Sequence, residues 1–249
     1  MSLTSPVIAV VGASGGLGAS TLALAVGRRL AATGPPAVVA DLDLARGGLE
    51  VTAGVEHLPG RRWDDLRQVR GRLPPDALLP VLPGEDGCHV LSARGGISPD
   101  LPDVAVRDVL ASLASGPARL VLDLPAWSPA LPQVLSAGSL VVVLTGLRTR
   151  ALADADAVVA RLLDGGVDGG VHGYPPCDVR LVTRGARTSA EVLDDVVAHL
   201  GVAHLHHLPD DPHVPRDAER GLFPGVARDA VRRCADRVVS VVDDVADAS

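Results

Sequence analysis

The residues best suited to chemistry form a glycine-rich turn near the beginning of the chain. The segment from Val10 to Thr21 reads Val-Val-Gly-Ala-Ser-Gly-Gly-Leu-Gly-Ala-Ser-Thr, and it lies between an apolar run at 7–11 and a helix expected over 20–32. Glycines permit a tight turn that brings backbone N–H groups against an anion, and a helix N-terminus adds partial positive charge at the same place. A turn of this kind between a strand and a helix predicts a phosphate-binding loop.

Lysine, which such loops normally carry, is missing from the whole chain. All 23 basic residues are arginine, and asparagine is absent as well. Codon usage in a GC-rich genome, such as an actinobacterial one, explains both absences. No lysine can therefore act here as a catalyst, form a Schiff base or bind a phosphate. Arginine is the only permanent cation that can take its place.

Two carboxylates follow apolar runs that are typical of buried strands. Asp41 follows the run at 37–40, and Asp123 ends the run at 120–123. A strand, a helix and a second strand within about 40 residues are the opening of a doubly wound sheet. We therefore expect an α/β fold with a doubly wound, mostly parallel sheet flanked by helices. The other expected elements are strands at 88–92, 139–145 and 179–183 and helices at 63–70, 104–115, 151–163, 189–200 and 226–245.

Length and composition restrict the class of protein. Apolar residues make up 47% of the 249 residues and aromatic residues 2%, so we expect a core of Leu, Val and Ala in a single domain over 1–249. A net charge of −7 disfavours non-specific binding to nucleic acid or anionic lipid. Three widely spaced cysteines, with no signal-peptide pattern and no transmembrane stretch, predict a cytoplasmic protein.

The glycines at 12, 16 and 18 are compatible with two families. They fit the Gly-x-x-x-Gly-x-Gly turn of short-chain dehydrogenases, in which Asp41 would bind the ribose of NAD(P). That family resemblance requires a Tyr-x-x-x-Lys pair for proton transfer. The single tyrosine, Tyr174, is followed four residues later by Asp178, and no lysine exists. A nicotinamide-dependent reductase is therefore the weaker alternative.

The second resemblance covers nearly the whole chain. The loop from Ser14 to Thr21 is similar to the Lys-Gly-Gly-x-Gly-Lys-Ser/Thr-Thr motif of the MinD/ParA-type deviant P-loop ATPases, with both lysines replaced. Later segments resemble that family in the same order, and within it the CpaE/TadZ-like, septum-site-determining-like branch. They are Val38–Leu44 with its Asp-x-Asp, Gly47–Leu49, Val121–Pro125 with the Walker B aspartate, Leu208–Pro212 and Ala218–Gly221. Many members carry an N-terminal receiver-like domain, which we do not expect here.

The resemblance implies a role for each residue of the loop and for both aspartates. The loop would bind the phosphates of ATP, Mg²⁺ would be held by a hydroxyl and a carboxylate, and one further carboxylate would orient the attacking water. The residues in these roles are Gly15, Gly16, Gly18, Ala19, Ser20 and Thr21 for the nucleotide, Ser20 and Asp123 for Mg²⁺, and Asp41 for the water.

The two missing lysines also have defined places in the resemblance. Ala19 stands where a lysine contacts the β- and γ-phosphates, and Ser14 stands where a signature lysine reaches the partner's nucleotide across a dimer. Arg46, Arg148 and Arg150 are the candidate replacements, although a place on the solvated surface is the commoner role for each of them. We therefore expect weak ATP binding and little or no hydrolysis.

The cellular role is implied by the resemblance alone. It predicts a positioning protein that acts in pilus or secretion-machine localisation or in septum-site determination. Such a protein would form a homodimer, contact protein partners of that apparatus and reach the membrane or the pole through them. We expect neither a specific nucleic acid partner nor direct membrane insertion. The alternative is a nucleotide-free interaction scaffold with the same fold.

Two other clusters, one of arginines and one of histidines, have ordinary structural explanations. The arginines around Trp63, at 61, 62, 67, 70 and 72, would suit an acidic partner, but a solvated helix face explains them as well. His204, His206 and His207 lack a further ligand at metal-binding spacing, so we expect surface or packing roles.

Overall fold

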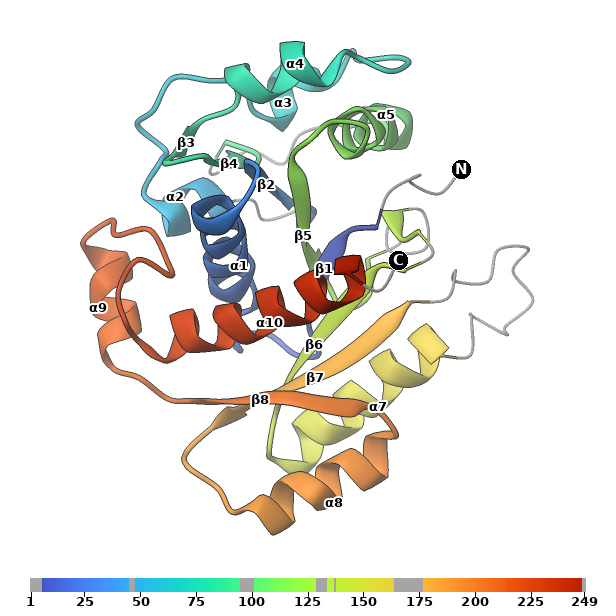
Figure 1. Cartoon of the computed structure of the whole chain (residues 1–249), viewed down its shortest axis with the longest axis vertical. Coiled ribbons are helices and arrows are strands. Elements are labelled where there is room, and N and C mark those ends of the chain that lie inside the picture. The colour runs from blue at the N-terminus through green and yellow to red at the C-terminus, as the bar shows by residue number, and fades with distance from the viewer. Residues whose placement is uncertain are drawn as a thin grey trace.

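Aliphatic strands in the middle of the chain place the glycine-rich turn at the centre of one sheet (Figure 1). The computed structural model describes residues 6–44, 48–94, 101–128, 134–136, 138–163 and 177–247. Within these residues the sheet has the order β3-β4-β2-β5-β1-β6-β7-β8, in which only β3 and β4 pair antiparallel. The strands are β1 (Ile8–Gly12), β2 (Ala37–Asp41), β3 (Gly84–Glu85), β4 (Cys88–Leu91), β5 (Arg119–Pro125), β6 (Leu140–Gly146), β7 (Asp178–Gly185) and β8 (Ala203–Pro209). The doubly wound, mostly parallel α/β fold is thereby confirmed.

Alternate residues of the strands feed two separate apolar cores. In β1, Ala9 and Val11 join one core and Ile8 and Val10 join the other, because successive side chains of a strand point to opposite faces. Both faces are therefore buried, as expected for a parallel sheet. The helices are α1 (Ala19–Thr33), α2 (Leu49–Ala53), α3 (Trp63–Leu66), α4 (Pro75–Leu78), the 3-10 turn η1 (Leu79–Val81), α5 (Asp103–Ala114), α7 (Thr149–Leu163), α8 (Ala190–Leu200), α9 (His213–Glu219) and α10 (Ala230–Asp247).

The helices divide between the two faces of the sheet. Helices α1 and α10 lie side by side on one face, where their buried residues share a core with α2 (Figure 1). Buried residues of α3, α5, α7 and α8 belong to the core on the other face. Every helix among the described residues is too short or too polar to cross a lipid bilayer.

Two boundaries differ from the sequence prediction for local reasons. The last helix begins at Ala230 instead of 226, because Pro224 and Gly225 form a turn first and the Asp229 carboxylate accepts a hydrogen bond from the Arg232 N–H at 2.8 Å. Gly225 has a φ of 84°, and a Cβ there would lie 3.0 Å from the Ala25 backbone on α1. The helix predicted at 63–70 ends at Leu66.

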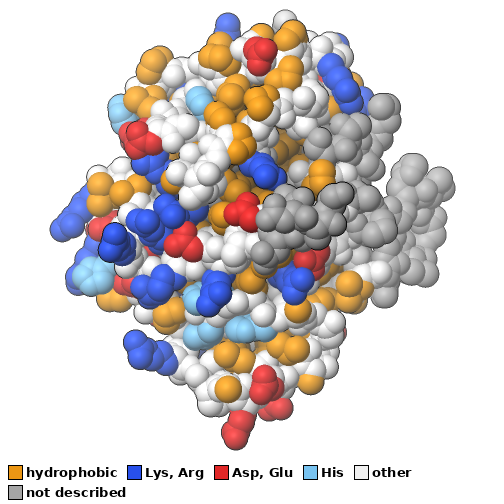
Figure 2. Space-filling view, in the orientation of Figure 1, with side chains coloured by type: hydrophobic (Ala, Val, Ile, Leu, Met, Phe, Trp, Pro, Cys, Tyr) orange, Lys and Arg blue, Asp and Glu red, His pale blue; other side chains and the backbone are white. Residues whose placement is uncertain are grey.

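Charged side chains of both signs cover the face that carries α9 and α10. Arginine side chains gather there, with aspartate and glutamate among them (Figure 2). Arg29 pairs with Asp236 at 2.5 Å, and Arg220 pairs with Asp217 at 3.9 Å. This surface is therefore a mixed one and not a field of a single sign.

Candidate functional site

The glycine-rich turn leaves the carboxyl end of β1, which lies between β5 and β6. Its path is anchored by the Ala13 N–H, which donates to the Leu144 carbonyl at 2.8 Å. Gly12 is required by close approach, since a Cβ there would lie 3.3 Å from both the Ala19 Cβ and the Ser14 carbonyl oxygen. The turn closes through Gly16 and Gly18, whose φ angles of 78° and 85° favour glycine.

The backbone of this turn has the donors that an anion needs. Among the described residues, none accepts a hydrogen bond from a backbone N–H between Ser14 and Thr21. Helix α1 begins at Ala19, so the last of these groups belong to its unpaired first turn, and no side chain caps the helix there. Consecutive N–H groups at a helix N-terminus form an anion-binding concavity, and this loop therefore fits a phosphate group.

Ser20 and Asp123 meet beside this loop. Ser20, on α1, lies close enough to the Asp123 carboxyl group, on β5, for its side chain to lower the pKa of Asp123. Burial is the main cause that raises the pKa of Asp123 to about 7; the negative charges of Asp41 and Asp43 add to the rise, and Ser20 opposes it. A hydroxyl and a buried carboxylate next to an anion site form a donor set that suits Mg²⁺.

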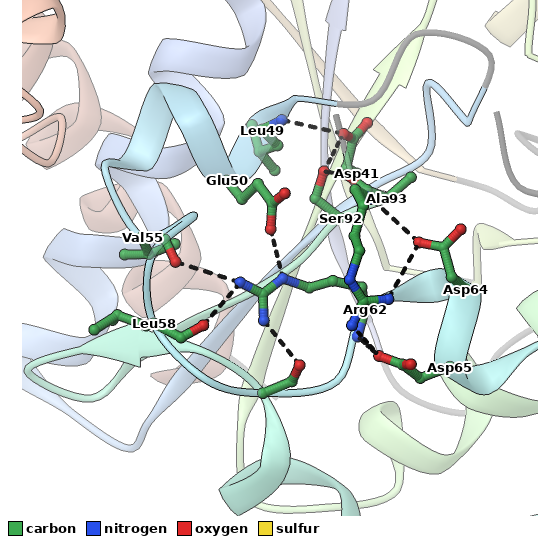
Figure 3. Close-up of polar contacts among 12 residues, drawn as sticks. Asp41, Leu49, Glu50, Val55, Leu58, Arg62, Asp64, Asp65, Ser92 and Ala93 are labelled. Carbon is green, nitrogen blue, oxygen red and sulfur yellow. Dashed lines mark hydrogen bonds and ion pairs between the residues drawn. The ribbon is translucent and has the colours of Figure 1, made fainter. Parts of the chain in front are cut away.

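Asp41 lies directly beside Asp123 in the sheet, as its register partner between β2 and β5. Both Asp41 oxygens already accept hydrogen bonds: one from the Asp43 N–H at 2.9 Å, the other from the Ser92 hydroxyl at 2.8 Å and the Leu49 N–H at 3.4 Å (Figure 3). Burial raises the pKa of Asp41, and these three hydrogen bonds oppose the rise. In this arrangement the Asp41 carboxylate binds backbone and side-chain donors of the segments around it. Asp43 is a second carboxyl group, and its negative charge raises the pKa of Asp123.

A second layer of residues, which the sequence did not point to, holds Asp41 in place. The Trp63 indole N–H donates to the Asp41 carbonyl at 2.8 Å, and the Trp63 backbone N–H donates to the Ser92 carbonyl at 3.1 Å. Trp63 itself is fully buried. The carboxyl end of β2 is therefore fixed from three later segments of the chain, those carrying Leu49, Trp63 and Ser92; Figure 3 shows Leu49 and Ser92 beside Asp41.

Replacing Trp63 by Phe tests this layer. Phe keeps most of the apolar contact but leaves the buried Asp41 carbonyl without its indole donor, so the free energy of unfolding is expected to fall by about 1–3 kcal/mol. Urea unfolding followed by circular dichroism measures the change. Trp127→Phe, at a side chain that is 59% exposed, is the matched control and should change little. Equal stability of the two variants would show that the indole hydrogen bond carries no weight.

The arginines proposed as substitutes for lysine differ in their placement. Arg148 and Arg150 are exposed, and Arg150 pairs with Asp154 on its own helix at 3.3 Å. Arg46 lies outside the described residues. Arg184, near the end of β7, instead contacts the loop: its Nη1 donates to the Leu17 carbonyl at 2.7 Å. No local pattern in the sequence signals this contact, because the two residues are 167 positions apart.

The remaining predicted residues take the following places. Ser14 is half-buried and Gly15 and Gly16 are exposed at the turn. Thr21 lines a hollow of about 120 Å³ between α1, α9 and the segment at 222–229, whose walls are mostly apolar and include Phe223 and Pro224. Ala19 is half-buried at the first position of α1.

The histidines and arginines outside the loop have structural partners. The Thr183 hydroxyl lies 3.0 Å from His204 Nε2 and 3.0 Å from His207 Nδ1, and in the described ranges no three His, Cys, Asp or Glu side chains are grouped so that they could hold a metal ion. His204 and His207 therefore contact a buried threonine of the neighbouring strand, as packing histidines would. The prediction of a solvated arginine run is wrong for Arg62, which is buried and pairs with Glu50 at 2.5 Å.

Comparison by sequence finds relatives that are themselves uncharacterized, and comparison by structure finds distant relatives whose structures are solved. No protein-family model matches the chain. Two uncharacterized proteins of Mycobacterium tuberculosis, from strains CDC 1551 / Oshkosh and H37Rv, are each 34% identical over 238 residues. This alignment covers 95% of the chain but 63% of each relative, so the chain spans less than two thirds of the proteins it matches.

Solved structures place the fold. A ParA family ATPase from Chlorobium tepidum TLS superimposes with a TM-score of 0.74 at 16% identity, over 93% of this chain and 96% of that one. The MinD cell division protein of Aquifex aeolicus gives 0.70 at 18% identity, over 96% and 98%. The septum site-determining protein MinD of Pyrococcus horikoshii, solved with Mg-ADP, gives 0.67 at 18% identity, over 99% and 98%. The chain therefore has the fold of the ParA and MinD P-loop ATPases.

Proposed function

We propose that the chain is a MinD/ParA-like positioning protein with a degenerate nucleotide site, which binds ATP weakly and hydrolyses little or none of it. The observation that carries this proposal is the survival of the anion cradle together with the Ser20–Asp123 pair, in a loop that has Ala19 and Ser14 where lysines would stand. The Pyrococcus neighbour with Mg-ADP has the same fold, which supports nucleotide as the ligand.

The missing lysines explain why binding would be weak and not abolished. A charge-assisted hydrogen bond contributes about 1.5–3 kcal/mol, so the loss of one weakens binding by about 10- to 100-fold. Hydrolysis suffers more, because phosphoryl transfer depends on positioning and on charge stabilisation of the transferred group. With no lysine in the chain, the main cations that would face that group are absent.

Magnesium would be held by the Ser20 hydroxyl and by Asp123, and when bound it would neutralise charge on the β- and γ-phosphates. The chain's own contribution is to present Ser20 from the first turn of α1 and Asp123 from β5, close enough for Ser20 to lower the pKa of Asp123. Asp41 keeps β2 and the segment after it in register with that pair.

Restoring the loop lysine gives the direct test. Ala19→Lys is expected to tighten ATP–Mg²⁺ binding by about 10- to 100-fold, since it returns the cation to the phosphate end of the loop. Isothermal titration calorimetry of both proteins measures the change. Ala32→Lys, at an exposed position near the other end of α1, adds the same charge and should leave the affinity unchanged.

The outcomes of this titration separate the candidate functions. Binding by the wild type that increases in Ala19→Lys supports a degenerate nucleotide site. Binding by neither protein, nor by Ser14→Lys combined with Ala19→Lys, would overturn it and favour the nucleotide-free scaffold. A wild-type turnover like that of an ordinary lysine-containing ATPase would also overturn it. Binding of NAD(P)H would favour the reductase; its Tyr174 lies outside the described residues.

The proposed cellular role is the localisation of a pilus or secretion machine, or septum-site determination, by a CpaE/TadZ-like homodimer. The fold is that of proteins which act with partners, since the Aquifex MinD has also been solved in complex with MinC. Light scattering with and without ATP–Mg²⁺ tests the dimer: we expect the dimer fraction to rise with nucleotide in Ala19→Lys more than in the wild type.

A further inference from the structure

The phosphate loop of this chain is held from behind by an arginine of another strand. Arg184 stands near the end of β7, and its Nη1 donates to the Leu17 carbonyl at 2.7 Å. Gly18 allows this approach: a Cβ at that position would lie 2.5 Å from the same nitrogen. The guanidinium group is thus seated against the Leu17–Gly18 peptide of the loop.

The geometry of a peptide bond decides what this contact does. The described chain has no cis peptide bond, and in a trans peptide the N–H points away from the C=O of the same unit. When Arg184 holds the Leu17 carbonyl, the Gly18 N–H is therefore turned to the opposite side. That N–H has no acceptor among the described residues, and it belongs to the row of N–H groups that forms the anion cradle.

The charge on Arg184 is only partly compensated. Its Nε lies 3.4 Å from Asp210 Oδ1, at the edge of hydrogen-bond range, and the Asp210 side chain is 66% exposed to water. Other arginines close to α1 are already engaged, because Arg28 pairs with Asp86 and Arg29 pairs with Asp236. Among the described arginines, Arg184 is the one whose guanidinium group donates a hydrogen bond to the loop.

We propose that Arg184 is the cation of this phosphate loop. It fixes the Leu17–Gly18 peptide with its N–H toward a bound phosphate. Through that polarised peptide it supplies the positive charge that a loop lysine would otherwise provide. It is a positioning residue, since it acts through the peptide. The inference rests on the proposed nucleotide site and deepens it, because it states which residue makes a lysine-free loop able to hold an anion.

The first test removes the guanidinium group. Arg184→Ala is expected to weaken ATP–Mg²⁺ binding by about tenfold, measured by isothermal titration calorimetry, and to flatten the dependence of affinity on sodium chloride concentration. Arg184→Lys should recover part of the loss, since it keeps the charge without the planar fork. Arg187→Ala, three residues further on at an exposed position, is the control and should bind as the wild type does.

A second variant moves the affinity in the opposite direction. Asp210→Asn removes the acidic partner of Arg184, so ATP–Mg²⁺ binding is expected to tighten by about two- to fivefold. A purely structural latch would not produce this gain, because Asn loosens the contact that orients Arg184. Circular dichroism of each variant shows whether it is folded, and the Asp210→Asn result still decides the matter if Arg184→Ala is not.

Each outcome bears on a different statement. If the wild type binds ATP–Mg²⁺ and Arg184→Ala binds equally well or better, the role of Arg184 is overturned and the nucleotide site stands. If only Ala19→Lys binds, Arg184 does not serve as the cation of the loop, although the site exists. If neither binds, the proposed function itself fails. Weakening in Arg184→Ala together with tightening in Asp210→Asn supports the inference.

Discussion

Replacing Asp123 by Asn is expected to stabilise the magnesium-free protein at about pH 8 and to leave it nearly unchanged at about pH 3. Burial, and then the charges of Asp41 and Asp43, raise the pKa of Asp123 from 3.8 to about 7 in the folded state. The folded state therefore binds this proton more tightly than the unfolded state does. The stability that this provides is fully present below pH 3.8 and is lost as the pH rises through 7.

Asn cannot acquire the buried charge, so the variant does not suffer this loss. The difference in free energy of unfolding between variant and wild type should grow with pH to about 4 kcal/mol at most. Urea unfolding in EDTA at a series of pH values measures it. Asp195→Asn, at an exposed position on α8, should change stability by less than about 0.5 kcal/mol at every pH. A difference that stays constant between about pH 5 and pH 8 would contradict the buried, proton-binding state of Asp123.

This prediction has a functional side. The charge that is unfavourable in the folded protein is the one that a divalent cation at Ser20 and Asp123 would neutralise. Magnesium binding requires the deprotonated carboxylate, so Mg²⁺ should restore stability to the wild type at about pH 8 and not to Asp123→Asn. A site of this kind is costly to keep without a ligand, which is consistent with a retained function.

The parts of the site that lie on strand ends could be predicted from the sequence. Aliphatic runs mark β2 and β5, and each run carries an aspartate at or near its carboxyl end, so that Asp41 and Asp123 become register partners. The turn that opens α1 is marked by its glycines, two of which adopt positive φ. These signals are local, because a strand, a turn and a helix start are each set by neighbouring residues.

The parts that depend on contacts between distant segments could not be predicted. Arg184 reaches Leu17 across 167 positions, and Trp63 reaches the Asp41 carbonyl from a short helix without clear periodicity. Ser92 follows a short strand and looks like any other serine in the sequence. Hydrogen bonds of this kind depend on tertiary geometry, and residue type alone gives many donors that could have made them.

Arg62 is the clearest case, because a residue of a predicted solvated run is instead a buried anchor. Its Nε donates to Glu50 at 2.5 Å, and its two other nitrogens donate to three carbonyls, those of Gly60, Val55 and Leu58 (Figure 3). Both charged side chains are almost fully buried. The pair thereby ties α2, whose first residue donates to Asp41, to the loop that precedes Trp63, which also donates to Asp41.

Replacing Arg62 by Ala is expected to lower the free energy of unfolding by about 3–5 kcal/mol, because it leaves the Glu50 charge buried without its partner and removes a donor from three carbonyls, of which that of Val55 keeps the Leu58 N–H. Glu50→Gln should cost less, since the amide oxygen still accepts from Arg62 and the guanidinium keeps its three carbonyls. Arg67→Ala, at an exposed position just after α3, should cost less than about 0.5 kcal/mol. Urea unfolding ranks the three variants.

A small effect of Arg62→Ala would mean that Asp41 is held by its own hydrogen bonds alone. A large one would show that the buried ion pair stabilises α2, which contacts α1 and whose first residue donates to Asp41.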